Sequence, residues 1–401
     1  MARRLASIAA AGAVLVGLLA TAPPLASAEV DTTYGWDHRA ATVSGTYQVV
    51  VGQFAGDEAS DILFYGKGSA ADTLWIGNAG ERGQAGFDVV PLTIGGDVTL
   101  VVGDFGGDSY DDLLLYGKGA EPDALWTSID AEAIFSKRAV TIGGTYLPTV
   151  LTDYRDGGKD DIVFLGPGAT PDYLWHFTDS PGTTNYEGPG TYASRSLTVN
   201  GSYQLVPGDY SGDGIGDLVL YQPGTAADYK WVFNTAGAVT ESKLTVNGTY
   251  RPVPILGVPY DAILWWADGT AGKAFWASNG STFVAKPVPA ENATGTVTPY
   301  GLGSAVIEQP GAGKAERQFF YDGTAASFYT LANVAKHDQT VAKPLVGNLD
   351  DDADGYLDIF WYGPGSARDE LWYSPSTLAA KAAPAPSGVP VQAKPDGLEP
   401  R

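Results

Sequence analysis

The chain of 401 residues has no cysteine, three histidines, and 24 basic residues against 46 acidic ones. The absence of cysteine excludes disulfides, thiolate zinc sites, iron–sulfur clusters and cysteine nucleophiles, so something else must rigidify the fold. The net charge of −22 repels phosphate backbones, which makes nucleic acid and anionic membranes poor partners and cations good ones. Its 52 glycines, beside abundant Thr, Val, Tyr and Trp, indicate tight turns between short strands.

The two ends of the chain have the composition of segments outside a folded domain. Residues 1–28 combine a basic start, an apolar stretch and the small-residue site Ala26-Ser27-Ala28, which is typical of a secretory signal peptide. We therefore expect a secreted, extracellular protein without membrane insertion, folded over residues 29–373. Residues 374–401 are rich in Ala, Pro, Ser and Lys without apolar periodicity. This predicts a disordered tail, with a wall-attachment spacer as the alternative.

A short apolar segment recurs seven times between these ends. The steps between copies are 51, 49, 56, 44, 43 and 54 residues, and their mean of about 49 is typical of propeller blades. Tryptophan marks the same place in six copies, with Tyr329 expected to replace it in the sixth. The segments are Asp61–Tyr65, Asp112–Tyr116, Asp161–Leu165, Asp217–Tyr221, Asp261–Trp265, Ser304–Glu308 and Asp358–Tyr362, and the tryptophans are Trp75, Trp126, Trp175, Trp231, Trp276 and Trp372.

Each repeat contains four expected strands separated by Gly-rich turns, which predicts an all-β, seven-bladed propeller of four-stranded antiparallel blades. The first copy of the turn, Thr42-Val-Ser-Gly45, has no Leu-Trp strand before it, whereas Leu371-Trp372 has no turn copy after it. The two ends are complementary. We therefore expect residues 36–43 to form the outer strand of the last blade and to close the ring.

An acidic loop precedes several of the apolar segments. In the fourth repeat, Asp209, Ser211, Asp213 and Asp217 stand at positions 1, 3, 5 and 9 around Gly214. A glycine at position 6 lets the backbone turn so that oxygen ligands converge on one hard cation, as in calcium loops. The seventh repeat has the same pattern in Asp350, Asp352, Asp354 and Asp358. Position 12 is hydrophobic in both loops, which excludes an EF-hand.

These loops resemble those of the FG-GAP or VCBS repeat, the integrin-α-like propeller unit, in which an aspartate-rich loop between the first two strands of a blade binds calcium. The resemblance covers residues 43–373 and implies Ca²⁺ as the cofactor. It is specific in the fourth and seventh repeats and weaker in the second, where the candidate ligands Asp104, Asp108 and Asp112 match but Gly106 gives no side-chain ligand. The first and third loops are less complete, with Gln53, Asp57 and Asp61 in one and Asp153, Gly157 and Asp161 in the other. The alternative is that these aspartates only cap turns.

The repeated tryptophans could serve as sugar platforms or as packing between blades. An aspartate stands three residues before the tryptophan in five repeats, and it could bind hydroxyls or hold a turn. Repetition favours the structural role for both residues, because every blade must pack against its neighbours. The aspartates are Asp72, Asp123, Asp172, Asp228 and Asp369.

The repeat is broken in its fifth and sixth units, which lose the acidic loop. Trp265, Trp266 and Glu308 appear there, and we name them as candidate ligand-binding residues, with solvent exposure in an eroded blade as the alternative. No catalytic motif stands out, since His38, His176 and His337 belong to different units.

We therefore expect a monomeric extracellular module that binds a glycan or protein and uses calcium structurally. An extracellular polysaccharide hydrolase or lyase, with its site in the propeller funnel, is the alternative, and a scaffold is a third possibility.

Overall fold

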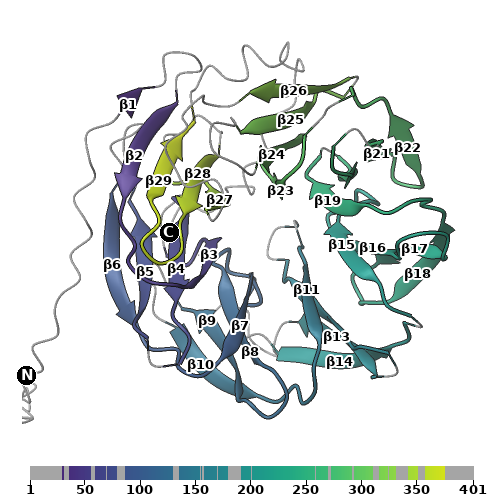
Figure 1. Cartoon of the computed structure of the whole chain (residues 1–401). Coiled ribbons are helices and arrows are strands. Elements are labelled where there is room, and N and C mark those ends of the chain that lie inside the picture. The colour runs from purple at the N-terminus through teal and green to yellow at the C-terminus, as the bar shows by residue number, and fades with distance from the viewer. Residues whose placement is uncertain are drawn as a thin grey trace, which may run out of the picture.

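The computed structural model describes residues 29–30, 36–55, 59–68, 70–78, 86–129, 135–153, 155, 158–168, 170–178, 191–199, 201–257, 259–269, 272–290, 293–309, 316–323, 325–330, 342–350 and 357–374. Over these residues the chain forms a seven-bladed β-propeller (Figure 1). The predicted signal peptide and tail lie outside the described residues, apart from Ser374. No helix in the described part of the chain is long and apolar enough to cross a membrane.

The first three blades each use four consecutive strands, which pair antiparallel in chain order. The first blade contains β3 (Gln48–Gly52), β4 (Asp61–Tyr65), β5 (Asp72–Gly77) and β6 (Phe87–Leu92). The second contains β7 (Val98–Gly103), β8 (Asp112–Gly117), β9 (Asp123–Ser128) and β10 (Phe135–Val140). The third contains β11 (Leu147–Leu151), β12 (Asp161–Leu165), β13 (Asp172–Thr178) and β14 (Thr191–Leu197).

The next three blades repeat this arrangement. The fourth contains β15 (Gln204–Gly208), β16 (Asp217–Tyr221), β17 (Asp228–Phe233) and β18 (Val239–Leu244). The fifth contains β19 (Arg251–Ile255), β20 (Ala262–Trp266), β21 (Ala274–Ser278) and β22 (Phe283–Lys286). The sixth contains β23 (Thr296–Pro299), β24 (Ser304–Glu308), β25 (Arg317–Tyr321) and β26 (Ala326–Thr330).

The last blade combines strands from both ends of the domain. Its first three strands are β27 (Lys343–Gly347), β28 (Asp358–Tyr362) and β29 (Asp369–Tyr373), and β2 (Asp37–Ala41) pairs antiparallel with β29. The two-residue strand β1 (Glu29–Val30) extends this sheet to five strands. The outer strand of the blade thus comes from the N-terminal side of the domain. That this pairing holds the ring closed against unfolding stays a prediction.

The first strands of the seven blades surround the centre of the ring, and each lies next to the first strand of the following blade (Figure 1). The second strand is buried along its whole length in every blade. Both of its faces are covered, which explains why it is continuously apolar and not alternating. The third strand is less completely buried in most blades, since β5 and β17 each contain two half-buried residues, although all five residues of β29 are buried.

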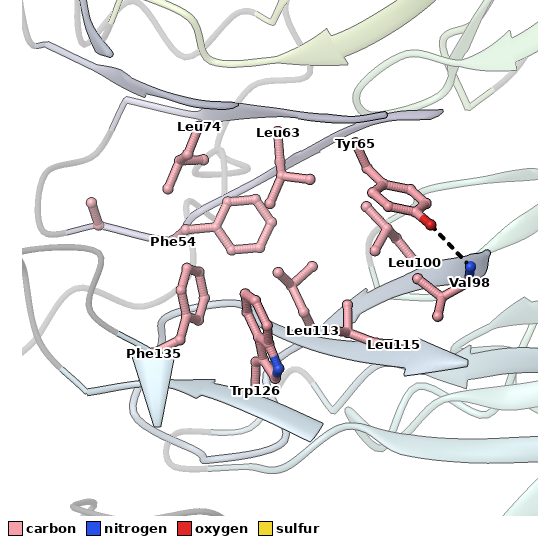
Figure 2. Packing of buried hydrophobic residues seen from close by; sticks show 11 residues of the cluster. Phe54, Leu63, Tyr65, Leu74, Val98, Leu100, Leu113, Leu115, Trp126 and Phe135 are labelled. Atoms are coloured by element: carbon pink, nitrogen blue, oxygen red, sulfur yellow. Dashed lines mark hydrogen bonds between the residues drawn. The ribbon is translucent and has the colours of Figure 1, made fainter. Parts of the chain in front are cut away.

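The hydrophobic core is divided into clusters, and each cluster fills the space between two adjacent blades. Figure 2 shows the cluster between the first and second blades, where Phe54 and Leu63 of one face Leu113 and Trp126 of the other. The Tyr65 hydroxyl accepts a hydrogen bond from the Val98 N–H across this boundary, at 3.1 Å. Blade-to-blade packing is therefore what holds the ring together.

The repeated tryptophans belong to these clusters. Trp75, Trp126, Trp175 and Trp231 are at most 7% exposed and contact residues of the neighbouring blade. The aspartate three residues earlier uses both carboxylate oxygens on backbone N–H groups. In the first blade, Asp72 accepts from Gly66 at 2.9 Å and from Ile94 at 2.7 Å, and the other four aspartates make the equivalent pair of bonds. The structural role expected for both residues is confirmed.

The structure corrects the expected register in two blades. Phe319 of β25 pairs with the second residue of β24, as Trp75 pairs with the second residue of β4. Phe319 therefore takes the place of the repeated tryptophan, and Tyr329 lies on the fourth strand instead. In the fifth blade Ala262, and not Asp261, begins the second strand. Asp261 is the last residue of the preceding loop, one position earlier than expected.

Candidate functional site

Five blades begin their second strand with a buried aspartate. In each of them, Oδ1 of this aspartate accepts a hydrogen bond from a backbone N–H at the far end of the third strand, at 2.8–3.1 Å. This bond pins the second strand to the third in the same way each time. The aspartates are Asp61, Asp112, Asp161, Asp217 and Asp358, with the N–H donors Gly77, Ser128, Phe177, Phe233 and Ser374.

The partner of the second carboxylate oxygen, Oδ2, differs between blades. In the first, fourth and seventh blades a loop N–H donates to it, at 2.7–2.9 Å. In the third blade Oδ2 of Asp161 lies 2.8 Å from Nδ1 of His176. In the second blade no described residue donates a hydrogen bond of ordinary geometry to Oδ2 of Asp112, although the side chain is fully buried. The Gly106 N–H is near enough to this carboxyl group to lower its pKa, but it is the smallest of the effects on that pKa. One of five equivalent carboxylates is therefore unsatisfied.

Two further carboxylates of the same loop lie near Asp112. Asp104 accepts hydrogen bonds from the N–H groups of Gly107 and Ser109, at 2.5 and 2.9 Å. A methyl group placed on the Cα of Gly106 would lie 3.4 Å from Oδ2 of Asp112 and 3.6 Å from Oδ1 of Asp108. Asp108 and Asp112 thus both direct oxygens towards the backbone at Gly106.

The electrostatics of this loop show a shortage of positive charge. Burial raises the pKa of Asp108 to about 6, and the charge of Asp104 adds to the shift. Burial also raises the pKa of Asp112 well above its usual range, with contributions from the charges of Asp104 and Asp108. Each carboxylate is therefore close enough to raise the proton affinity of another. A buried group of this kind needs a cation or a proton.

In the fourth-blade loop, backbone N–H groups donate hydrogen bonds to the predicted residues Asp209 and Asp217. Asp209 accepts from the N–H groups of Gly212 and Gly214, at 2.6 and 2.9 Å, and from the Ser211 hydroxyl at 3.4 Å. Burial raises the pKa of Asp217 to about 7, and the charges of Asp209 and Asp213 add to it. Turn capping and cation binding both fit this geometry, since an oxygen that accepts one N–H keeps a second lone pair.

The other acidic loops are less complete in the described part of the chain. Asp57, Gly157, Asp352 and Asp354 lie outside the described residues, whereas Asp350 and Asp358 are buried at the seventh loop. In the third blade Asp153 pairs with Arg155 and Asp161 pairs with His176. No set of three or more His, Asp or Glu side chains among the described residues already has the arrangement of a metal centre. Calcium binding therefore stays a proposal.

The candidate ligand residues of the fifth and sixth blades are buried. Trp265 packs between the fourth and fifth blades and Trp266 between the fifth and sixth, and neither indole is exposed. Nε1 of Trp266 donates a hydrogen bond to Asp268 at 3.1 Å. Glu308 ends β24 and is 9% exposed. In this conformation the two indoles have no surface to offer a ligand, and ligand binding by the three residues stays a prediction.

A set of hydrogen bonds between adjacent blades was not predicted from the sequence. The residue that precedes the second strand of one blade accepts a hydrogen bond from the first loop residue of the blade before it. Oδ2 of Asp111 accepts from the Gln53 N–H at 2.7 Å, and Oδ2 of Asp160 accepts from the Asp104 N–H at 3.1 Å. Asp261 does the same for Asp209, at 2.7 Å. The doubled acids Asp111-Asp112 and Asp160-Asp161 were the available signal.

A cavity of about 210 Å³ lies between the third and fourth blades. Asp153, Arg155, Lys159 and the His176–Asp161 pair line it on one side, and Asn234 lines it on the other. Because Nδ1 of His176 faces Asp161, the pair fixes the imidazole orientation and leaves Nε2 without a hydrogen-bond partner among the described residues.

Comparisons with known proteins support the fold. No protein-family model and no curated protein matches the chain. Among solved structures, a lectin of Agrocybe aegerita, studied for its specific recognition of non-reducing terminal N-acetylglucosamine, matches with a TM-score of 0.53 and 16% identity over 74% of this chain and 82% of its own. A rhamnogalacturonan lyase of Bacillus licheniformis matches with a TM-score of 0.33 and 10% identity over 85% of this chain and 88% of its own. The lectin shows likeness of fold alone, and the lyase score carries no argument.

Proposed function

We propose that this chain is a secreted, calcium-binding β-propeller of the FG-GAP or VCBS type, which serves as an extracellular binding module. The observation that carries the calcium part is Oδ2 of Asp112, a fully buried carboxylate oxygen without a partner in the described structure. Its equivalents in four other blades all have one. A hard divalent cation is a suitable missing partner, because calcium takes carboxylate and backbone carbonyl oxygens.

Asp104, Asp108 and Asp112 would hold the cation in the second blade, and Asp209, Ser211, Asp213 and Asp217 in the fourth. In the seventh blade the candidates are Asp350, Asp352, Asp354 and Asp358. Bound calcium supplies positive charge that offsets the repulsion between these carboxylates. Since only the folded loop gathers them, binding also stabilises the fold by mass action. It would thus do part of what disulfides do in other secreted proteins.

Thermal melting in calcium and in chelator tests the calcium proposal. We expect the midpoint to rise with calcium concentration and to fall when a chelator is added. Magnesium at the same concentration should give a smaller rise, because it demands tighter octahedral geometry and dehydrates reluctantly. Equal midpoints in calcium and chelator would refute the proposal.

The binding-module part of the proposal rests on two other observations. It is supported by the likeness of fold to the lectin and by the polar cavity between the third and fourth blades. The imidazole, amide, guanidinium and carboxylate groups that line this cavity match the mixture of donors and acceptors on a sugar. A glycan array should return at least one ligand whose binding falls in a His176→Ala or Asn234→Ala variant. Binding that is unchanged in both variants would move the site elsewhere.

A polysaccharide-acting enzyme is the second candidate, and the His176–Asp161 pair is the observation that favours it. A histidine oriented by a carboxylate can act as a general base through its other nitrogen. Incubation of any array ligand with the protein, followed by analysis for shorter products, distinguishes the two functions. Turnover that is lost in His176→Ala supports the enzyme, whereas binding without turnover supports the module.

A further inference from the structure

The third blade directs two basic side chains towards the acidic loops of its neighbours. The guanidinium of Arg155 pairs with Asp153 of its own loop, while its side chain passes close to the backbone of the fourth-blade loop. A methyl group on the Cα of Gly214 would lie 2.9 Å from Cγ of Arg155. The charge of Asp213 contributes to raising the pKa of Arg155. Lys159 reaches the other way, into the second blade.

The ammonium of Lys159 lies at the candidate cation site of the second blade. Its Nζ donates a hydrogen bond to the carbonyl oxygen of Gly106, the residue beside which Asp108 and Asp112 direct their oxygens. The positive charge of Lys159 lowers the pKa of Asp108, against the larger effects of burial and of Asp104. A cation supplied by the protein itself therefore already acts on this group of carboxylates. It does not satisfy them fully, since Oδ2 of Asp112 has no partner in the described structure.

We propose that Lys159 is a built-in competitor for calcium and sets the affinity of the second-blade site, an inference that rests on the calcium proposal above. A divalent ion among Asp104, Asp108 and Asp112 would be repelled by an ammonium group at Gly106. The same ammonium occupies a backbone carbonyl that could otherwise be a ligand. Calcium must therefore displace or weaken the Lys159 contact, which lowers its apparent affinity.

The fourth-blade loop provides an internal comparison. The residue two places before the second strand is Lys159 in the third blade and Tyr260 in the fifth. The ring of Tyr260, and not an ammonium group, lies against Gly212 of the fourth-blade loop. Arg155 of the third blade also lies beside this loop, but its guanidinium is paired with Asp153. Among the described residues no cation is bonded to the backbone of the fourth-blade loop, so this site should bind calcium more tightly than the second-blade site.

The test is calorimetric titration of the chelator-stripped full chain with calcium. The second-blade event is identified as the one that an Asp108→Asn variant loses. In Lys159→Met, which keeps the aliphatic stem and removes the charge, we expect this event to be at least about tenfold tighter than in the wild type. Lys159→Arg, which keeps the charge, should stay within about twofold of the wild type.

Lys118→Met is the matched control. Lys118 is an exposed residue of the second blade, in the turn after β8, so this variant makes the same change in net charge at the end of β8 that lies away from Asp112. Equal affinity of the event in Lys159→Met and wild type, or an equal gain in Lys118→Met, would overturn the role of Lys159 while leaving the calcium site intact. If neither the wild type nor Lys159→Met shows an event that Asp108→Asn removes, the second-blade calcium site itself is refuted.

Discussion

Replacing Asp112 by asparagine should have opposite effects in chelator and in calcium. The amide oxygen can keep the hydrogen bond that Oδ1 accepts from the Ser128 N–H. The amide nitrogen replaces an oxygen that accepts no well-formed hydrogen bond by a neutral donor near Asp104 and Asp108. Leaving a buried polar group unsatisfied costs about 1–3 kcal/mol. In chelator the variant should therefore be as stable as the wild type, or more stable by up to about 2 kcal/mol.

The corresponding shifts in melting temperature are measurable. An unfolding entropy of about 2.1 cal/mol/K per residue, over roughly 340 residues, gives about 0.7 kcal/mol/K. A gain of about 2 kcal/mol thus raises the midpoint of Asp112→Asn in chelator by about 3 °C. Calcium at a hundredfold excess over its Kd stabilises the wild type by about 2.7 kcal/mol through this site, or about 4 °C. The variant should lose most of that increment, so the order of the two midpoints reverses.

Differential scanning calorimetry at neutral pH is the assay, and Asp72→Asn is the matched control. Both oxygens of Asp72 accept hydrogen bonds from backbone N–H groups. In Asp72→Asn the amide nitrogen would therefore face one of these N–H donors, and that hydrogen bond would be lost. This control should be destabilised in calcium and chelator alike and should keep the wild-type calcium increment. The reasoning is refuted if Asp112→Asn keeps the full calcium increment, or if it is destabilised in chelator as strongly as Asp72→Asn.

Three further predictions concern the ring and its acidity. Deletion of residues 29–44 removes β2 and the hydrogen bond from the Val43 N–H to Asp369. Calorimetry should therefore show a melting midpoint that is lower by at least several degrees. An unchanged melting midpoint would contradict the role given to β2. The hydroxyl of Tyr116 joins the second and third blades by hydrogen bonds to the Gly144 carbonyl and from the Tyr146 N–H. Tyr116→Phe should lower the free energy of unfolding, measured in urea, by about 1–3 kcal/mol. A loss below about 0.3 kcal/mol would contradict this link between the blades. Burial raises the pKa of Asp369 to about 6, so its folded state binds a proton more tightly than the unfolded chain does. The stabilisation from that proton is complete below about pH 4 and is lost as the pH rises through 6. Without calcium the midpoint should be higher at pH 5 than at pH 7.5, and the reverse order would show that this carboxylate does not behave as described.

The blades were predictable because each repeats one local pattern. The buried second strand, the tryptophan and the aspartate three residues before it are set by short spacings that the sequence displays directly. The predicted register was wrong in the two blades where this pattern is incomplete. In the fifth blade Asp261 resembles the aspartate that begins a strand, yet it ends the loop and bonds to Asp209 of the previous blade. In the sixth blade Phe319, not Tyr329, packs in place of tryptophan.

The candidate cation site was predictable only in part. Spacing identified Asp104, Asp108 and Asp112, but it ranked this loop below those of the fourth and seventh repeats, because Gly106 offers no side-chain ligand. What spacing does not show are contacts between distant residues, such as the bond from Lys159 to the Gly106 carbonyl across 53 positions. Whether a loop N–H donates a well-formed hydrogen bond to the carboxylate oxygen, as it does for Asp217, or fails to, as at Asp112, depends on the exact path of the loop backbone. Local spacing does not determine that path.

The most direct test of the central claim is an anomalous diffraction measurement on crystals of the full chain grown with calcium and soaked in terbium, a calcium substitute with a strong anomalous signal. We expect a peak in the second-blade loop within about 2.3–2.6 Å of Oδ2 of Asp112, the distance range of calcium–oxygen bonds. Asp104 or Asp108 should share that ion. A loop with no anomalous peak, in which Oδ2 of Asp112 still lacks a partner, would contradict the account.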